Sequence, residues 1–286
     1  MKKLNHLLSS SIGFLPDRLY CQITFFLKHK RFANLSLPFK FNDKLLLKKL
    51  TDRDPKLSMY VDKYDVREWV RDQIGEEYLV PIIGIYNSIE DVNFEDLPSR
   101  FALKVTNGSQ NNLICSDKSK IDWEQKKKQI QKWLDFNYYK RTREWPYKNN
   151  ANRIIIEEFL ETGGESLYDY KFWCFNGKIE FVQIDIDRES NHKRDFYTQD
   201  FTEKINLKVT YPNSGLLLEK PANYDTMITI VEELANDFDY SRIDLYNING
   251  KIYFGEVTFY PGNCNERFIP SSYEDILGSK LQLPNS

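Results

Sequence analysis

The sequence predicts an α+β protein with two or three lobes, and three observations support this prediction. The chain of 286 residues is long for one small domain and suits lobes that share a cleft. Apolar residues recur at intervals of three and four between residues 42 and 74, which is the spacing of amphipathic helices. Further along, short apolar segments flank Asn176-Gly177 and Asn249-Gly250, and an Asn-Gly dipeptide is a strong signal for a β-hairpin.

The N-terminal part is expected to be helical. The periodic segment 42–74 is followed by Gly75, which suits the end of a helix. Residues 78–85 contain Pro81 and are expected to form an edge strand or a connector, so we place the first lobe boundary there. The expected division is an N-terminal lobe of residues 1–85, a central lobe of residues 86–161 and a C-terminal lobe of residues 162–286.

The central and C-terminal parts are expected to consist of strands and two helices. Strand 101–105 precedes a polar loop over 106–112 with one glycine, and Asp122 can cap a helix that runs to about Tyr139. The remaining expected elements are strands over 113–115, 153–160, 170–175, 178–186, 242–246 and 251–257, and a helix over 227–238.

Composition and charge exclude several classes of function. The formal charge of −2 and the isoelectric point near 6.0 argue against a nucleic-acid-binding protein, which normally carries a basic surface. The four cysteines are widely spaced and the three histidines are scattered, so we expect free thiols, no histidine-ligated transition metal and a reducing cytoplasm. No apolar run approaches the roughly 18 residues of a transmembrane segment, while peripheral contact with the inner face of the membrane stays open.

The last expected hairpin carries the strongest candidate site. A two-residue turn at Asn249-Gly250 would pair Asp244 with Gly255 and turn Glu256 to the opposite face. We favour a three-residue connection with a bulge, which pairs Arg242 with Glu256. In that register one face of the hairpin is polar, with Arg242, Asp244, Glu256 and Thr258, and the other is apolar, with Ile243, Leu245, Val257 and Phe259.

This polar face suits phosphate chemistry. Two carboxylates on neighbouring strands can hold magnesium, which keeps several waters and bridges phosphate oxygens. Arg242 beside them could stabilise the charge on a transferring phosphoryl group. The alternative is an acidic surface hairpin with a cross-strand pair between Arg242 and Glu256.

Three segments in order resemble the ATP-grasp fold of the D-alanine and glutathione-type ligases: Lys104 before a polar loop, IIIEEFL at 154–160, and RIDLYNINGKIYFGEVTFYPG at 242–262. The stretch from about residue 39 to residue 268 is also similar to the TupA-like ATP-grasp proteins of bacterial teichuronopeptide and capsular polysaccharide biosynthesis. The phrases that carry this similarity are VDKYDVREWV, REWPYKN, DYKFWCFNGK, SNHKRDFY and VTFYPG. The resemblance implies a mostly helical N-terminal lobe and two α+β lobes that enclose a nucleotide between antiparallel sheets.

The resemblance also implies a set of residues that bind ATP. Lys104 would contact the α- and β-phosphates, and the loop after it, with Gly108 as its sole glycine, would cover them with backbone N–H groups. Lys171 is a second phosphate candidate, because it alternates with Asp169 on one strand face. The other implied contacts are Glu157, Glu158 and Leu160 with the adenine, Asp169 with the ribose, and Arg67 with the phosphates.

The same resemblance assigns the catalytic end of the site. Lys193 and Arg194 would lie near the γ-phosphate, and Arg242 would steady the transition state that leads to an acyl phosphate. Asp244 and Glu256 match the magnesium ligands. Thr258 stands where D-alanine ligases have an asparagine, which puts a second magnesium ion in question.

The resulting expectation is a carboxylate–amine ligase that uses ATP and Mg²⁺ to form an acyl phosphate, which an amine then captures. Its expected partners are a uronic-acid carboxylate on a nucleotide sugar, lipid-linked glycan or polymer, and an amino-acid amine. One rival is a glycosyltransferase, for which Asp185-Ile186-Asp187 fits the metal-binding DxD pattern but lies within an expected strand. Another is a non-catalytic nucleotide- or sugar-binding protein of the same fold.

Overall fold

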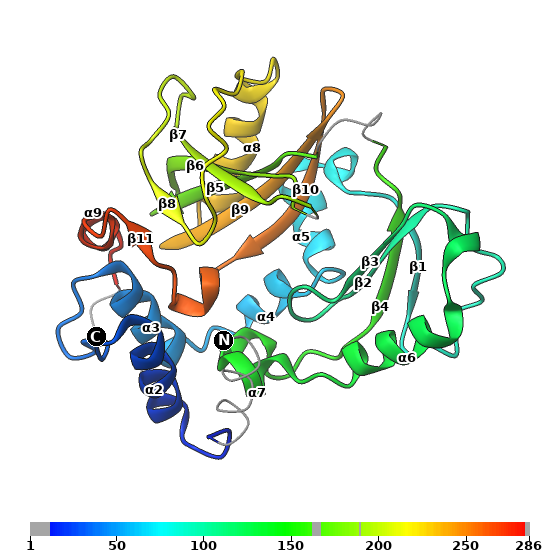
Figure 1. Ribbon diagram of the computed structural model, residues 1–286, viewed down its shortest axis with the longest axis horizontal. Coiled ribbons are helices and arrows are strands. Elements are labelled where there is room, and N and C mark those ends of the chain that lie inside the picture. Colours follow the sequence, from blue (N-terminus) through cyan, green and yellow to red (C-terminus); the bar gives the residue numbers. More distant parts are fainter. Residues whose placement is uncertain (1–11, 162–166, 189, 284–286) are drawn as a thin grey trace.

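The computed structural model describes residues 12–161, 167–188 and 190–283. Two antiparallel sheets lie on either side of the helices α4 (Lys56–Val61) and α5 (Val66–Ile74), as Figure 1 shows. The chain combines helices with antiparallel sheets, so the predicted α+β class is confirmed.

The N-terminal part is helical, as predicted. The expected helical segment 42–74 forms three helices, and α5 ends at Gly75 with a φ of 109°, where glycine is favoured over other residues. Besides α4 and α5, this part contains α2 (Asp17–His29), α3 (Phe41–Thr51) and the short 3-10 helix η1 (Glu76–Tyr78).

The four-stranded sheet has the order β1-β4-β2-β3. Its strands are β1 (Ile82–Tyr86), β2 (Phe101–Val105), β3 (Asn112–Cys115) and β4 (Ile154–Glu158). β1 is an edge strand, as expected for this segment. Phe101, Leu103 and Ile156 point to one face and pack against Ile130 of α6 (Trp123–Leu134). The opposite face is therefore free to carry polar side chains.

Helix α6 begins as predicted but ends earlier. The carboxylate of Asp122 accepts a hydrogen bond from the backbone N–H of Gln125, as expected for the N-cap. The helix stops at Leu134, so its expected continuation to Tyr139 is wrong. The reason is a second cap, because the Asn137 side chain accepts a hydrogen bond from the backbone N–H of Lys140 and starts a separate helix, α7 (Tyr138–Thr142). The 3-10 helix η3 (Trp145–Tyr147) follows α7.

The five-stranded sheet has the order β10-β9-β5-β6-β7. Its strands are β5 (Asp169–Phe175), β6 (Lys178–Ile186), β7 (Lys193–Thr198), β9 (Tyr240–Ile248) and β10 (Lys251–Thr258). Helix α8 (Tyr224–Ala235) packs on one face, where Phe172 meets Tyr224. The remaining elements are η2 (Lys118–Lys120), β8 (Lys208–Val209), η4 (Pro261–Cys264), β11 (Phe268–Ile269) and α9 (Tyr273–Lys280).

The last hairpin has a different register from the one we favoured. Asn249 and Gly250 have φ values of 52° and 78° and form a two-residue turn, so the expected three-residue connection is wrong. A β-bulge at Gly255 then shifts the register, which pairs Asp244 with Glu256 and Arg242 with Thr258. Because of the bulge, the four polar residues of the hairpin still lie on one face, as we expected from the three-residue connection. The predicted pairing of Arg242 with Glu256 is wrong.

Two hydrophobic cores lie within the described residues. One core joins the N-terminal helices to the five-stranded sheet. Phe41 of α3, for example, packs against Trp173 of β5. The other lies between the four-stranded sheet and α6. The lobe boundaries at residues 85 and 161 stay a prediction, although β1, which spans residue 85, pairs with β4.

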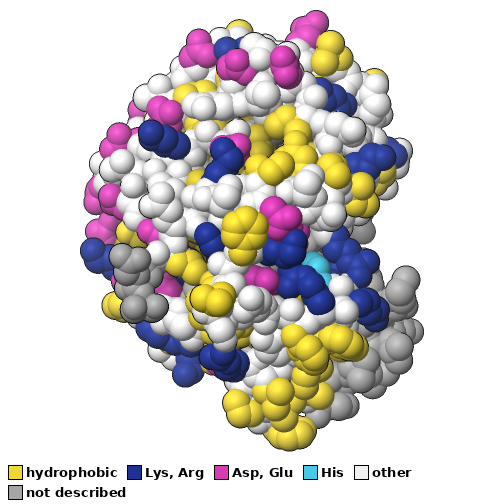
Figure 2. All heavy atoms as spheres, turned by 90° about the vertical axis from the view of Figure 1, so that its left-hand side faces the viewer, with side chains coloured by type: hydrophobic (Ala, Val, Ile, Leu, Met, Phe, Trp, Pro, Cys, Tyr) yellow, Lys and Arg dark blue, Asp and Glu magenta, His cyan; other side chains and the backbone are white. Residues whose placement is uncertain are grey.

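None of the helices that the structure describes is long and apolar enough to cross a membrane. All four cysteines are buried free thiols, as predicted. Apolar side chains gather at the lower end of the molecule in Figure 2, the end at which α2 lies in Figure 1. Exposed members from α2 and its flanking segments are Phe14, Leu19, Phe26, Leu27, Phe32, Leu37 and Phe39.

Candidate functional site

The face of the five-stranded sheet opposite α8 carries a row of charged side chains. Glu256, Asp244 and Lys171 are direct neighbours on the adjacent strands β10, β9 and β5. The Lys171 ammonium contacts Asp244, and its Nζ lies 2.6 Å from Asp169 Oδ2. Asp169 and Lys171 therefore share the face that their alternation on one strand predicted.

Arg242 is the centre of this row. Its Nε lies 2.7 Å from Asp244 Oδ1, and its Nη2 donates to Glu256 Oε1 at 3.0 Å and to Thr258 Oγ1 at 3.1 Å. The oxygens of the three predicted metal ligands thus converge on one cationic group. Side chains that share one cation in this way can also share a magnesium ion whose remaining ligands are waters and phosphate oxygens.

The environment separates the pKa values of the two acids. Burial raises the pKa of Asp244 to about 6, although Arg242 and Lys171 act in the opposite direction. Partial burial also favours protonation of Glu256, but there Arg242 and Lys171 outweigh it and lower the pKa to about 2. The Glu256 side chain is 45% exposed and that of Asp244 only 2%, so Glu256 is the more accessible ligand.

The two carboxylates fit a magnesium ion that depends on a bound phosphate. In the described part of the chain, acids, histidines and cysteines form no group of three that could hold a metal ion by themselves. Magnesium is commonly held by one or two carboxylates together with substrate phosphates, so a pair is sufficient. The residues present therefore fit Mg-ATP. Whether Thr258 serves as a further ligand stays a prediction.

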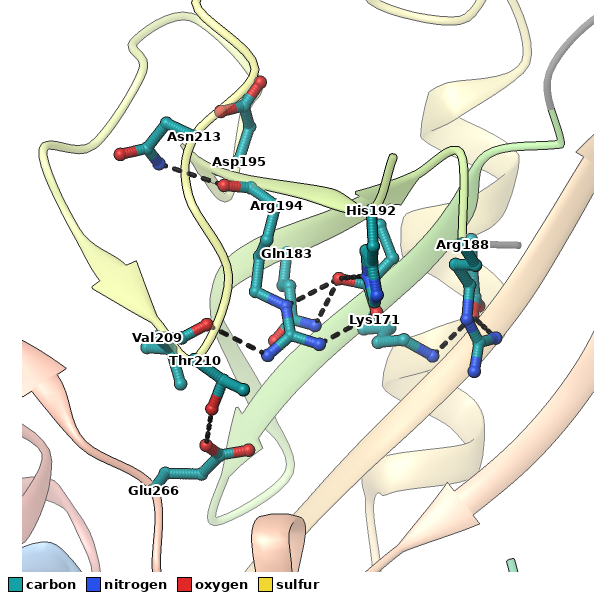
Figure 3. Close-up of polar contacts among 12 residues, drawn as sticks. Lys171, Gln183, Arg188, His192, Arg194, Asp195, Val209, Thr210, Asn213 and Glu266 are labelled. Atoms are coloured by element: carbon teal, nitrogen blue, oxygen red, sulfur yellow. Dashed lines mark hydrogen bonds and ion pairs between the residues drawn. The ribbon is translucent and has the colours of Figure 1, made fainter. Parts of the chain in front are cut away.

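Arg188, which we did not single out from the sequence, also belongs to this face. It lies in the connection between β6 and β7 (Figure 3), and its guanidinium contacts Asp169. This contact puts a half-exposed arginine beside the predicted ribose ligand. The sequence signal was weak, because Arg188 precedes a strand and belongs to no periodic pattern.

Arg194 is bound firmly within the sheet. Its Nε and Nη2 donate to Asp185 at 2.6 and 3.0 Å. Its Nη1 donates to the carbonyl of Val209 at 3.2 Å, as Figure 3 shows. These bonds anchor β7 to β6 and β8. Lys193 is its neighbour on β7, so the two side chains point to opposite faces and cannot both approach one phosphate. Their expected role near the γ-phosphate stays a prediction.

The four-stranded sheet presents a second charged cluster on the face away from α6. Lys104 Nζ donates to Glu157 Oε2 at 2.6 Å, and Arg67 Nη1 lies 3.5 Å from Glu157 Oε1. Three predicted nucleotide contacts thus lie together. Glu158 is exposed and alternates to the other face, and Leu160 is half-buried beyond the end of β4.

Lys63 joins the two clusters, and sequence reasoning missed it. Its Nζ donates to the carbonyl of Gly108 at 2.6 Å, and its positive charge also acts on Glu256. It therefore ties the predicted phosphate loop to the metal end of the site. The phrase VDKYDVREWV contains it four residues before Arg67, in the turn between α4 and α5.

A hollow of about 1230 Å³ lies elsewhere, between α3, α4 and the turn before β9. Its lining includes Lys48, Asp52, Tyr60 and Phe238, and none of the predicted site residues. The candidate site is therefore defined by the two facing charged clusters, and this hollow is separate from it.

Comparison with known proteins assigns the family. The profile of the TupA-like ATP-grasp family matches residues 43–282, which is most of the chain. The chain belongs to the TupA-like ATP-grasp family. ATP-grasp proteins are typically ATP-dependent ligases, and the match includes every candidate residue that the sequence singled out. No curated protein matches this TupA-like chain.

Several solved structures are similar to this TupA-like protein. D-alanine–D-alanine ligase from Bacillus anthracis complexed with ATP is 16% identical, with 71% of this chain and 55% of that chain covered and a TM-score of 0.42. L-amino acid ligase from Bacillus licheniformis is 12% identical, with 93% and 62% covered and a TM-score of 0.48. The ATP-grasp ligase PsnB with minimal precursor, Mg and ADP is 11% identical, with 84% and 66% covered and a TM-score of 0.41. The chain thus spans less than two thirds of these structures.

Proposed function

We propose that this TupA-like ATP-grasp protein is an Mg-ATP-dependent carboxylate–amine ligase. The observation that carries the proposal is the convergence of Asp244, Glu256 and Thr258 on Arg242, opposite a second cluster with Lys104 and Arg67. One cluster offers oxygen ligands for a metal ion and the other offers cations for phosphate. The alternative, an acidic hairpin that serves only as protein surface, gives no reason for a second charged cluster opposite it.

The chain's own residues bind and orient the reactants in this proposal. Asp244 and Glu256 would hold magnesium, which would neutralise phosphate charge when bound. Lys63 positions the loop around Gly108, whose backbone N–H groups face the phosphates. Arg242 then stabilises negative charge on the transferring phosphoryl group. The further assigned contacts are Lys104, Arg67 and Lys171 with phosphates, Glu157, Glu158 and Leu160 with adenine, Asp169 with ribose, and one of Lys193 and Arg194 near the γ-phosphate.

The proposed reaction has two balanced steps. A substrate carboxylate oxygen bonds to the γ-phosphorus while the bond to the bridging oxygen breaks, which gives ADP and an acyl phosphate. The amine nitrogen then bonds to the acyl carbon, and phosphate leaves. Positioning of reactants and stabilisation of charge account for most of the rate in such chemistry.

We propose a uronic-acid carboxylate and an amino-acid amine as substrates, in the synthesis of a bacterial surface polysaccharide such as capsule, O-antigen or teichuronopeptide. Support comes from the resemblance to TupA-like proteins of such pathways. A cytoplasmic location fits the buried free thiols. The apolar side chains of α2 support peripheral contact with the inner face of the membrane.

The test is a screen for ADP release that crosses free and UDP-linked uronic acids with amino acids, followed by the mass of the product. We expect ADP release that requires both substrates, and a product whose mass is that of the two minus one water. Asp244→Asn and Glu256→Gln should each abolish turnover, with Glu124→Gln on the exposed face of α6 as the matched control. UDP release without ATP would favour a glycosyltransferase, and Mg-ATP binding without turnover would favour a binding protein.

A further inference from the structure

Helix α2 is apolar on two sides. Its inner side, which includes Phe25, belongs to the hydrophobic core that joins the N-terminal helices to the five-stranded sheet. On its outer side Leu19, Ile23 and Phe26 follow one another at intervals of four and three residues, and Leu19 and Phe26 are 49% and 39% exposed. The outer side of a surface helix normally carries polar side chains. The exposed apolar side of α2 is therefore suited to contact with a partner.

The segments that flank α2 enlarge this exposed side. Phe14 before the helix is 84% exposed, and Phe32 and Leu37 after it are 63% and 80% exposed. The ring of Phe32 stacks on that of Phe26, with centroids 4.8 Å apart. Apolar side chains that gather at one end of a protein commonly mark an interaction surface (Figure 2). We use the name α2 apolar surface for the exposed members Phe14, Leu19, Phe26, Leu27, Phe32, Leu37 and Phe39.

Hydrogen bonds hold this surface in place. The side chain of Gln22 donates to the backbone carbonyl of Ala33 at 2.9 Å and accepts from the backbone N–H of the same residue at 2.9 Å. This pair of bonds keeps the returning chain beside α2. The hydroxyl of Tyr20 donates to the carbonyl of Arg141 at 2.8 Å, which ties α2 to α7. The apolar side chains are thus carried by a segment that the rest of the protein supports.

The charge of this region is positive. Residues 12–40, which comprise α2 and its two flanks, contain five basic side chains and one acidic side chain, whereas the whole chain has a formal charge of −2. The acid is Asp17, whose Oδ1 lies 3.5 Å from Nε of Arg143. Two of the bases form ion pairs with acids of α3 and α9. The other three, Arg18, Lys28 and Lys30, are exposed and form no ion pair with another described residue.

These charges distinguish a lipid surface from a second copy of the chain. A symmetric dimer would place the same patch of both subunits face to face, so the unpaired bases of one copy would approach those of the other. A bilayer with anionic headgroups attracts the bases and admits apolar side chains beneath them. Lysine and arginine side chains border the apolar end of the molecule in Figure 2, as such a contact requires. With 13 residues, α2 is about 20 Å long, which is enough to lie along a bilayer and too short to cross it.

We infer that the α2 apolar surface docks on an anionic lipid bilayer, with α2 in the plane of the interface. Phe14 and Phe32 enter the boundary between headgroups and acyl chains, while Arg18, Lys28 and Lys30 contact lipid phosphates. The inference builds on the proposed peripheral contact with the membrane and adds its residues and its class of lipid. It does not depend on the ligase reaction, because the α2 apolar surface contains none of the residues assigned to that reaction.

The test is cosedimentation of the full chain with vesicles of two compositions. One kind contains phosphatidylcholine alone, and the other contains equal parts of phosphatidylcholine and phosphatidylglycerol. We expect the wild type to bind the anionic vesicles at least about tenfold more tightly than the neutral ones. High salt should reduce this difference, because it screens the attraction between the bases and the headgroups.

A first double variant tests the apolar contribution. Phe14→Ser with Phe32→Ser should weaken binding to both kinds of vesicle by at least about tenfold, because two aromatic rings no longer leave water on binding. The matched control is Leu216→Ser with Leu217→Ser, at positions that are 58% and 81% exposed elsewhere in the chain. The control should bind both kinds of vesicle as the wild type does.

A second double variant tests the charge. Lys28→Gln with Lys30→Gln should weaken binding to the anionic vesicles by at least about tenfold and leave binding to the neutral vesicles unchanged. The matched control is Lys128→Gln with Lys132→Gln, at exposed positions of α6. This control should retain the preference for anionic vesicles.

The outcomes separate the inference from its alternatives. Sedimentation of the wild type with neither kind of vesicle, or equal binding to both, would overturn it, and so would wild-type binding by either surface variant. A dimer that binds no vesicle and that the phenylalanine variant dissociates would assign the surface to a second copy. Equal thermal midpoints in all variants would show that a loss of vesicle binding is not a loss of fold. Absence of turnover in the ADP-release screen would overturn the ligase function and leave the vesicle result as it is.

Discussion

Replacement of Glu144 by glutamine should make folding stability less dependent on pH. Burial raises the pKa of Glu144, which precedes η3 and is 5% exposed, from about 4.5 in the unfolded chain to about 7 in the folded protein. The unfolded chain therefore releases this proton first as the pH rises, and the folded state loses stability between the two pKa values. Glutamine has the same shape and no charge, so it removes this effect.

The magnitude follows from the size of the pKa shift. At about 1.4 kcal/mol for each pKa unit, the shift corresponds to a penalty of about 3 kcal/mol once both states are ionised. Part of it is already present at pH 5. The stability of Glu144→Gln relative to the wild type should therefore rise by about 2 kcal/mol between pH 5 and pH 8.

Urea unfolding at pH 5, 6, 7 and 8 measures this difference. Other groups titrate in the same way in both proteins, so their contributions cancel. Glu124→Gln, at an exposed position, should show a constant difference from the wild type across the same range. A constant difference for Glu144→Gln would refute the reasoning, because it would mean that Glu144 ionises as readily in the fold as in the unfolded chain.

Two further predictions concern the loop and the bulge. Lys63→Met should weaken Mg-ATP binding by about tenfold, because the loop carbonyl of Gly108 loses a charge-assisted hydrogen bond. Titration with a fluorescent nucleotide measures the Kd, and an unchanged Kd would show that Lys63 does not position the loop. Gly255→Ala should lower the free energy of unfolding by about 1 to 3 kcal/mol and reduce turnover, because the new Cβ would lie 2.9 Å from the carbonyl oxygen of Asp244 and would force the strands apart. Urea unfolding and the ADP assay test this, and wild-type values in both would contradict the role of the bulge.

The parts of the fold that the sequence predicted depend on local chemistry. Gly75 ends a helix because its φ is positive, Asp122 caps one because its side chain reaches a free N–H group, and Asn176-Gly177 turns a hairpin. Each of these signals acts within a few residues. The helix that we expected to reach Tyr139 ends early, and the cause is also local, because Asn137 caps a new helix.

The parts that sequence reasoning missed depend on distant contacts. The bulge at Gly255 matters because Asp244 lies across from it, and no local pattern predicts that approach. Lys63 lies in a phrase that looked like ordinary helix. Its role appears only in the fold, where its charge acts on Glu256.

The central claim is that phosphate is transferred from ATP to a substrate carboxylate, and an isotope measurement tests it most directly. A uronic acid labelled with ¹⁸O in its carboxylate should pass one labelled oxygen to inorganic phosphate in each turnover, because the acyl–oxygen bond breaks when the amine attacks. The label should appear only with Mg-ATP and should be lost in Asp244→Asn. Amide formation with unlabelled phosphate, or release of AMP or UDP in place of ADP, would contradict the account.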